Sequence, residues 1–217
     1  HISEISMLIV ESTSVAVTVA LLNELTKKSV KVIFCDEKHS PSFELTPYYD
    51  SCKSSLKLKQ QIDWDDHIKQ YIWTNIVAEK ISNQAKVLKQ FQLPQYTQLL
   101  HYIDEIEFND ATNREGHSAK VYFNALFGKS FSRKNDCPIN AMLNYGYSII
   151  LSAFNREVVS NGYITQLGLF HDNMFNQYNL SCDLMEPFRP FVDSIVKKSN
   201  PEKFDKEEKV QIYTLLN

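Results

Sequence analysis

The hydrophobic pattern of the chain changes near residue 62, and this change constrains the fold more than any other feature. Before it, short β-branched and apolar runs at residues 5–10 and 30–35 are separated by polar stretches, as is typical of β-strands. After it, apolar residues recur close to every 3.6 positions, which is typical of helices. We therefore predict an α+β fold with a small β-rich N-terminal domain at residues 1–52, a linker at residues 53–61 and a larger all-α domain at residues 62–217.

Within the N-terminal domain we expect the order strand, helix, strand. Ser14 is a candidate N-cap for the helix, which ends on Lys28. A turn at residues 36–41 then precedes a further strand at residues 43–49. Because two or three strands alone are only marginally stable, this β-rich unit should pack against the rest of the chain.

The helical periodicity of the second domain is clearest in two stretches. Each stretch places apolar residues on one face of a helix. The first stretch contains Trp64, Ile68, Ile72, Ile76, Ile81, Ala85 and Leu88, and the second contains Met142, Gly146, Ile149, Ile150, Ala153 and Phe154.

The charge of the chain is weakly negative overall and locally positive. The formal net charge is −3 at pH 7, which argues against a surface that is basic all over. Residues 111–160, however, carry six Lys and Arg against three Asp and Glu. Any surface that binds nucleic acid should therefore be local and lie in this stretch.

The four cysteines are isolated from one another in the sequence. Cys35, Cys52, Cys137 and Cys182 form no CxxC pair and have no histidine at zinc-finger spacing, which is typical of reduced, cytosolic proteins. The chain contains no signal-peptide pattern and no apolar run long enough to span a bilayer. We therefore expect a cytoplasmic protein that does not act at a membrane.

Catalytic chemistry, if present, must come from dispersed residues, since the chain has no Gly-rich phosphate loop, GxSxG elbow or HExxH motif. Thr112 and Glu115 have the spacing of a helix capping box, so Glu115 has a purely structural alternative. His171 follows a short apolar run and could equally be a hydrogen-bonded structural histidine.

Asp183 and Glu186 stand three residues apart and would share one face of a helix. Two neighbouring carboxylates repel each other unless a cation or a proton lies between them. Alternatively, acidic residues in a first helical turn are stabilised by the helix dipole. Combined with an imidazole, these carboxylates would suit Mg²⁺ or Mn²⁺, and the imidazole favours Mn²⁺.

Several segments, in order, resemble the signatures of the CRISPR-associated integrase family of spacer acquisition, with details closest to its type II branch. The resemblance extends from about Ile5 to Val196. The segments that carry it are NREGH at 113–117, YFN at 122–124, LFG at 126–128, PINA at 138–141, NYGY at 144–147, GLFH at 168–171 and DLMEPFRP at 183–190.

The resemblance implies a metal-dependent DNA endonuclease and integrase that inserts new spacer DNA into a CRISPR array, by attack of a 3′-hydroxyl on a phosphodiester of the repeat. By motif, the catalytic residues and metal ligands fall on Glu115, His171 and Glu186, with Asp183 as an accessory group and Mg²⁺ or Mn²⁺ as the ion. The all-α domain would be the catalytic domain. Because the family's first strands would precede His1, we expect the β domain to be truncated.

The resemblance further implies a bacterial, cytoplasmic homodimer that binds DNA, both as spacer precursor duplex and as CRISPR repeat. It also implies a small ferredoxin-like partner and, in the type II branch, an adaptor and an effector nuclease. Two alternatives stay open: a non-catalytic helical scaffold that binds DNA or protein, and a metal phosphohydrolase that acts on small substrates.

Basic residues near the signatures are candidates for contacts with DNA phosphates. Such contacts would make binding sensitive to salt and largely independent of sequence. Alternatively, each could belong to a solvated helix face, and Arg189 could pair with Asp183 or Glu186. The candidates are Lys120, Lys129, Arg133, Lys134, Arg156 and Arg189.

Overall fold

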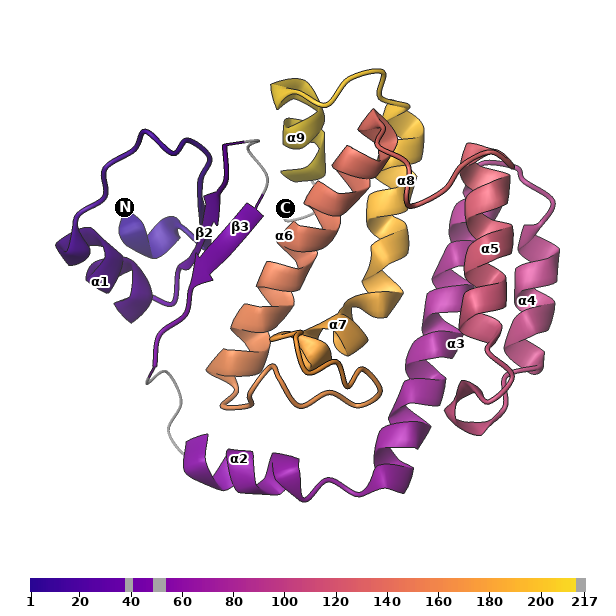
Figure 1. Ribbon diagram of the computed structural model, residues 1–217, viewed down its shortest axis with the longest axis horizontal. Helices are drawn as coiled ribbons and strands as arrows, with labels where there is room; N and C mark the ends of the chain where they lie inside the picture. The colour runs from indigo at the N-terminus through magenta and orange to yellow at the C-terminus, as the bar shows by residue number, and fades with distance from the viewer. Residues whose placement is uncertain (38–40, 49–53, 214–217) are drawn as a thin grey trace.

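A three-stranded sheet forms one end of the molecule (Figure 1). The computed structural model describes residues 1–37, 41–48 and 54–213. The central strand β2 (Lys31–Cys35) pairs in parallel with β1 (Met7–Val10) and antiparallel with β3 (Pro41–Leu45). The helix α1 (Val19–Lys27) connects β1 to β2, and its Leu25 is buried in a small apolar cluster with residues of β2.

Both α1 and β3 have boundaries that differ from the predicted ones. The N-cap of α1 is Thr18, whose hydroxyl accepts a hydrogen bond from the Leu21 N–H at 3.2 Å, so the prediction that Ser14 caps this helix is wrong. The strand predicted at 43–49 begins at Pro41, because Pro41 already pairs with Cys35 of β2, and it ends at residue 45. Residues 38–40 of the predicted turn, and residue 49, lie outside the described residues.

A helix, α2 (Ser54–Ile62), occupies most of the predicted linker at 53–61, of which residue 53 lies outside the described residues. Its Leu, Lys and Gln residues favour helix formation. Gln61 is buried and donates hydrogen bonds to the carbonyls of Ile164 (2.9 Å) and Leu167 (3.1 Å). The stretch is thus an ordered helix rather than an irregular connection, while the domain boundaries stay predictions.

The remaining described chain is helical and has two hydrophobic cores. Its elements are α3 (Asp66–Gln90), α4 (Tyr96–Asp104), η2 (Phe108–Asp110), α5 (Arg114–Phe127), α6 (Pro138–Ser160), α7 (Asn179–Met185), η3 (Glu186–Phe188), α8 (Arg189–Ser199) and α9 (Lys206–Tyr213). One core, with Trp73 and Tyr122, lies among α3, α4 and α5, and the other, with Tyr145 and Met185, lies among α6, α7, α8 and α9. Phe123 packs against both cores.

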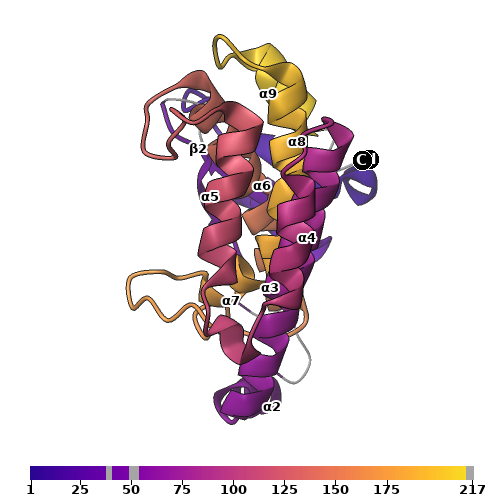
Figure 2. The same cartoon turned by 90° about the vertical axis from the view of Figure 1, so that its right-hand side faces the viewer.

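The sheet and the two groups of helices lie side by side across the molecule. Figure 1 shows α6 and α8 between the sheet and the group formed by α3, α4 and α5. Figure 2 shows these last three helices running alongside one another. The boundary between the two groups therefore runs along α3 and α5 on one side and along α7 and α8 on the other.

The helix α3 buries a different face from the one predicted. Ile68 and Ile72, assigned to the apolar face, are 56% and 37% exposed, whereas Trp73, Val77 and Ile81 are buried. The predicted period is correct, but the predicted phase is wrong in the first half of the helix. The buried face of α3 includes Lys80.

The predicted α+β class is confirmed, because strands are confined to the N-terminal part and the rest of the described chain is helical. In the described ranges, no helix combines the length and the apolar character needed to cross a membrane. Cys35, Cys137 and Cys182 are free thiols, and Cys52 lies outside the described residues.

Candidate functional site

Two carboxylates from distant parts of the chain converge on one ammonium group. Glu115 lies in the first turn of α5 and Glu186 begins η3, directly after α7. Lys80, from the middle of α3, places its Nζ 2.5 Å from Glu115 Oε1 and 2.5 Å from Glu186 Oε2. The structure thus brings two of the three predicted catalytic residues together around a single cation.

The start of α5 explains why the Glu115 side chain is available for this contact. Asn113 is the N-cap, in a left-handed conformation with φ of 51°, and accepts a hydrogen bond from the Gly116 N–H at 3.3 Å. The Asp110 carboxylate accepts from the Glu115 N–H at 3.1 Å, whereas the Thr112 hydroxyl donates to a carbonyl before the helix. The predicted capping box is therefore wrong, because Asn113 and Asp110 already cap this helix.

His171 is held by a fully buried carboxylate. The His171 Nδ1 lies 2.5 Å from Asp183 Oδ1, and since a carboxylate only accepts, we assign Nδ1–H as the donor. Asp183 also accepts backbone N–H groups from Leu169 (2.6 Å), Phe170 (3.1 Å) and His171 (3.1 Å). The hydrogen bond that His171 donates to Asp183 is the main reason that the pKa of His171 is raised. This arrangement leaves Nε2 as the ring's lone-pair nitrogen.

The segment that contains His171 is held by a tight turn at Gly168 and by stacking of Phe170 on α3. A Cβ at Gly168 would lie 2.3 Å from the His171 carbonyl oxygen and 2.8 Å from Asp183 Oδ2, so the tight turn requires glycine. Phe170 stacks on Trp73 of α3, with ring centres 4.3 Å apart and planes 1° apart. His171 therefore lies over α3, close enough for the charges of Glu186 and Glu115 to raise its pKa as well.

Glu186 is buried and paired with two cations. Besides Lys80, it accepts a hydrogen bond from Arg189 Nε at 2.9 Å, which confirms the predicted alternative of an Arg189–Glu186 pair. Burial raises the pKa of Glu186, but Lys80 and Arg189 together outweigh burial and hold it below its usual value. Burial likewise opposes the charge of Lys80, yet Glu186 and Glu115 raise its pKa.

Asp183 lies in the last turn of α7, so the alternative that it stabilises a first helical turn is wrong, whereas Glu186 does lie in the first turn of η3. Among the described residues, no cation pairs with both of them. Instead, Asp183 accepts hydrogen bonds from the backbone and ring N–H groups of the His171 segment. Glu186 pairs with Lys80 of α3 and with Arg189 of α8. The two carboxylates are thus separated into a positioning group and a cation-binding group.

A pocket of about 180 Å³ opens beside this cluster. The guanidinium carbons of Arg133 and Arg189 lie 5.3 and 4.7 Å from the centre of the Tyr147 ring. The Tyr147 hydroxyl donates to the buried Asp193 carboxylate. The pocket is lined by Lys80, Gln84, Ala119, Phe123, Arg133, Tyr147, Glu186, Arg189 and Asp193.

The donor chemistry fits a hard divalent cation. Two carboxylates already surround one cationic atom, and a histidine whose Nδ1–H is bound by a carboxylate is the usual form of a metal-ligating histidine. With Lys80 between the two carboxylates, however, the described residues contain no group of three or more His, Cys, Asp or Glu side chains arranged around a metal position. A metal would have to replace the Lys80 ammonium.

The basic residues predicted to contact DNA fall in different places. Arg133 and Arg189 line the pocket beside the carboxylates. Lys120, Lys129 and Lys134 are exposed on α5 and on the loop after it. Arg156 lies at the junction with the sheet, where it donates to the Ser6 carbonyl at 3.0 Å.

Lys80 is the site residue that sequence reasoning missed. It lies on the buried stripe formed by Trp73, Val77, Gln84 and Leu88. A lysine at such a position is a signal, because a buried ammonium must be paired. Apolar periodicity does not reveal Lys80, because only apolar residues define the predicted face of this helix.

The chain matches the family described as CRISPR associated protein Cas1 over residues 1–213. It is 33% identical over 196 residues to the CRISPR-associated endonuclease Cas1 of Neisseria meningitidis serogroup C (strain 8013), an alignment that covers 90% of this chain and 64% of that protein. The chain therefore spans less than two thirds of the length of this relative. The predicted family resemblance is confirmed.

Two solved structures share the fold. A casposase bound to integration product superimposes with a TM-score of 0.77 and 20% identity, over 96% of this chain and 68% of that one. A Cas6-RT-Cas1–Cas2 complex matches with a TM-score of 0.66 and 22% identity, over 89% of this chain and 23% of that one. At these identities the likeness establishes the architecture alone.

Proposed function

The chain belongs to the Cas1 family of CRISPR-associated proteins, and we propose that it carries the active site of a metal-dependent DNA endonuclease and integrase. In this proposal the protein joins the 3′-hydroxyl of a short DNA duplex to a phosphodiester of a CRISPR repeat. The name of the Neisseria relative, an endonuclease, and the integration product bound to the casposase support this class of reaction.

The convergence of Glu115 and Glu186 on one cation position, beside His171, is the observation that carries the proposal. Glu115, Glu186 and the Nε2 of His171 would hold Mg²⁺ or Mn²⁺. When bound, the metal would polarise the scissile phosphate and offset charge on the leaving oxygen. Asp183 keeps the imidazole in the tautomer and orientation that binding requires.

The remaining residues of the site bind and position the nucleic acid. Arg189 and Arg133 present guanidinium groups in the pocket next to Glu186, and this group suits phosphate oxygens. Strand transfer by a 3′-hydroxyl needs no covalent enzyme intermediate, so the site requires no serine or cysteine nucleophile. Catalysis would depend on positioning and on charge stabilisation.

The proposed partners follow the same reasoning. We propose a homodimer that works with a small ferredoxin-like partner, and the Cas6-RT-Cas1–Cas2 complex supports an assembly of this kind. Participation of a type II adaptor and effector nuclease stays a prediction.

Strand transfer measured with Mn²⁺ tests the proposed reaction. Glu115→Ala, His171→Ala and Glu186→Ala should each reduce the rate by at least about 100-fold. His117→Ala is the matched control, since His117 is exposed two residues from Glu115, and its rate should equal that of the wild type. Full activity in all three site variants would rule the proposal out.

The position of Lys80 favours one alternative, a non-catalytic helical scaffold that binds DNA or protein. In that case the ammonium would permanently neutralise Glu115 and Glu186. Thermal unfolding with Mn²⁺ separates the two functions, because a metal that binds the native state raises the melting temperature. A rise that disappears in His171→Ala supports the integrase, and no rise in the wild type supports the scaffold.

A further inference from the structure

Lys80 occupies the position that a metal ion would need. Its Nζ lies 2.5 Å from an oxygen of each carboxylate, and hard divalent cations bind such oxygens at about 2.0–2.6 Å. A divalent cation bound to these same two oxygens would be repelled strongly by the adjacent ammonium in this buried site. Metal binding therefore requires the ammonium to leave.

The space that can receive the ammonium is the neighbouring pocket of about 180 Å³, which Lys80 itself lines. Lys80 is almost fully buried, and α3 packs against α5 and η3 around it. A flexible side chain of four methylenes can change rotamer more easily than a packed helix can move.

The charge in that pocket is unfavourable for a further cation. Arg133 and Arg189 already place guanidinium groups in it. The pocket also contains two carboxylates, but Glu186 accepts from Arg189 and Asp193 accepts from the Tyr147 hydroxyl. An ammonium that moves there is stable only when an anion enters with it, and a phosphate group of DNA has the charge and the acceptor oxygens to bind three cationic side chains.

We propose that Lys80 couples metal binding to phosphate binding: it holds Glu115 and Glu186 until a nucleic-acid phosphate enters the pocket, and then moves to that phosphate as the metal binds. The inference rests on the proposed function. The coupling is reciprocal by thermodynamic necessity, so DNA tightens metal binding as much as metal tightens DNA binding.

Mn²⁺ affinity, measured by electron paramagnetic resonance with and without a short DNA duplex that lacks 3′-hydroxyls, tests this coupling without any turnover. In the wild type the duplex should tighten Mn²⁺ binding by about tenfold or more. In Lys80→Met the DNA-free affinity should rise by about tenfold, and the duplex should change it by less than about twofold. Lys86→Met is the matched control on the same helix, since Lys86 is exposed, and it should behave like the wild type.

Lys80→Gln repeats the measurement with a neutral side chain that still donates hydrogen bonds, in case the Met variant does not fold. An undiminished effect of DNA in the folded Lys80 variants overturns the coupling, while loss of Mn²⁺ binding in Glu186→Ala still supports the proposed active site. If Mn²⁺ binds the wild type and Glu186→Ala equally well, the proposed metal site and the coupling are both wrong.

Discussion

At the scale of single residues, the site separates two acidic side chains that are close in sequence. Asp183 satisfies three backbone N–H groups and the His171 ring, whereas Glu186 is bound by Lys80 and Arg189. A carboxylate that accepts several donors is difficult to replace, because each buried donor left without a partner destabilises the fold. The shape of the 168–171 turn therefore depends on one buried side chain.

Replacing Asp183 by Asn tests this dependence. Asn keeps the volume but replaces one acceptor oxygen with an NH₂ group that faces backbone N–H donors. We expect the free energy of unfolding to fall by about 3 kcal/mol, as measured by urea denaturation. Asp172→Asn, at an exposed position of the same segment, should leave stability within about 0.5 kcal/mol of the wild type. Equal stability of the two variants would contradict the structural role of Asp183.

Asp193 predicts a specific pH dependence of stability. Burial raises its pKa to about 6, against the hydrogen bond from the Tyr147 hydroxyl and the charges of Arg189 and Arg133, which lower it. Because the folded pKa lies above the unfolded value, the protonated group stabilises the fold at low pH. This contribution is complete below about pH 4 and is lost as the pH rises through about 6.

Asp193→Asn removes that ionisation. Relative to the wild type, the variant should gain up to about 3 kcal/mol between pH 4 and pH 8, since about two pKa units are involved. Urea unfolding across this pH range measures the difference between the two proteins. A difference that stays constant with pH would show that Asp193 does not titrate in the folded state.

At the scale of secondary-structure elements, α6 and α8 approach each other closely at Gly146. A Cβ at Gly146 of α6 would lie 2.5 Å from Cγ1 of Val192, which is fully buried on α8. Such a distance forces either the side chain or the helix to shift. The absence of a side chain at position 146 therefore sets the spacing of these two helices.

Gly146→Ala should destabilise the protein by about 1–3 kcal/mol through overpacking, although alanine favours helices over glycine by about 1 kcal/mol. Adding Val192→Ala removes both clashing methyl groups, so the double variant should be more stable than the sum of the two single changes implies. Thermal or urea unfolding of all four proteins gives this interaction energy. Strict additivity would mean that the helices can separate without strain.

Most strands and helices of the fold can be predicted from the sequence, but the buried face of α3 and the contacts of α2 cannot. The period-2 and period-3.6 patterns predict the strands and helices, because both report burial on one side of a regular element. They do not determine phase at a helix end with little core around it, and so Ile68 and Ile72 were assigned to the wrong face of α3. Gln61 of α2 was unpredictable for a related reason, since its partners are carbonyls about a hundred residues away.

The candidate site also contains residues that the sequence predicts and one that it does not. Glu115, His171 and Glu186 could be proposed because each belongs to a recognisable ordered segment, and the structure places them near one another. Lys80 belongs to no such segment, and its role follows only from the packing of α3 against α5 and η3. Tertiary contacts, and not local sequence, bring its charge to the carboxylates.

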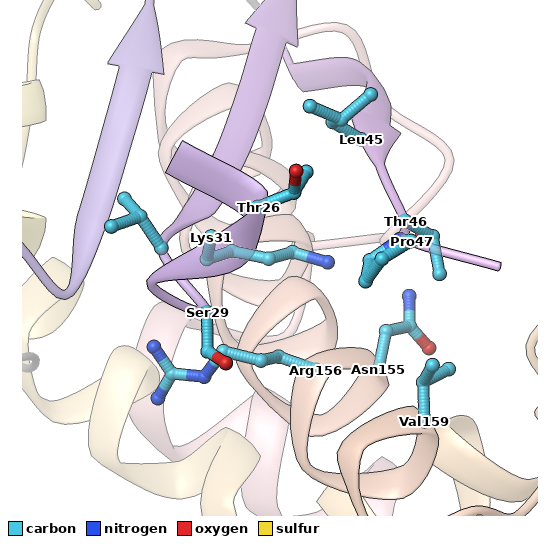
Figure 3. Close-up of a pocket in the computed structure, with 10 residues that line it drawn as sticks. Thr26, Ser29, Lys31, Leu45, Thr46, Pro47, Asn155, Arg156 and Val159 are labelled. Atoms are coloured by element: carbon cyan, nitrogen blue, oxygen red, sulfur yellow. The ribbon is translucent and has the colours of Figure 1, made fainter. Parts of the chain in front are cut away.

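At the scale of the whole molecule, the sheet contacts α6 through a buried ion pair between two of its strands. Lys31 of β2 pairs with Glu44 of β3, and both side chains are at least nine-tenths buried. Glu44 also accepts a hydrogen bond from the Ser152 hydroxyl of α6 at 2.9 Å. Figure 3 shows the Lys31 amine pointing toward a small pocket between the end of β3 and α6, bordered by Thr46 and Asn155. Burial lowers the pKa of Lys31, against the attraction of Glu44.

The Lys31–Glu44 ion pair predicts opposite effects on stability for substitution of one partner and of both partners. Glu44→Gln leaves a buried ammonium without its counter-charge, so the free energy of unfolding should fall by about 3–5 kcal/mol. Replacing both partners, with Lys31→Met and Glu44→Leu, removes the unpaired charge and should recover most of that loss. Hydrogen exchange of the β2 amides, measured beside urea unfolding, distinguishes local release of the sheet from global unfolding. Wild-type stability in Glu44→Gln would mean that Lys31 finds another partner, and the contact between sheet and helices would then depend on apolar packing alone.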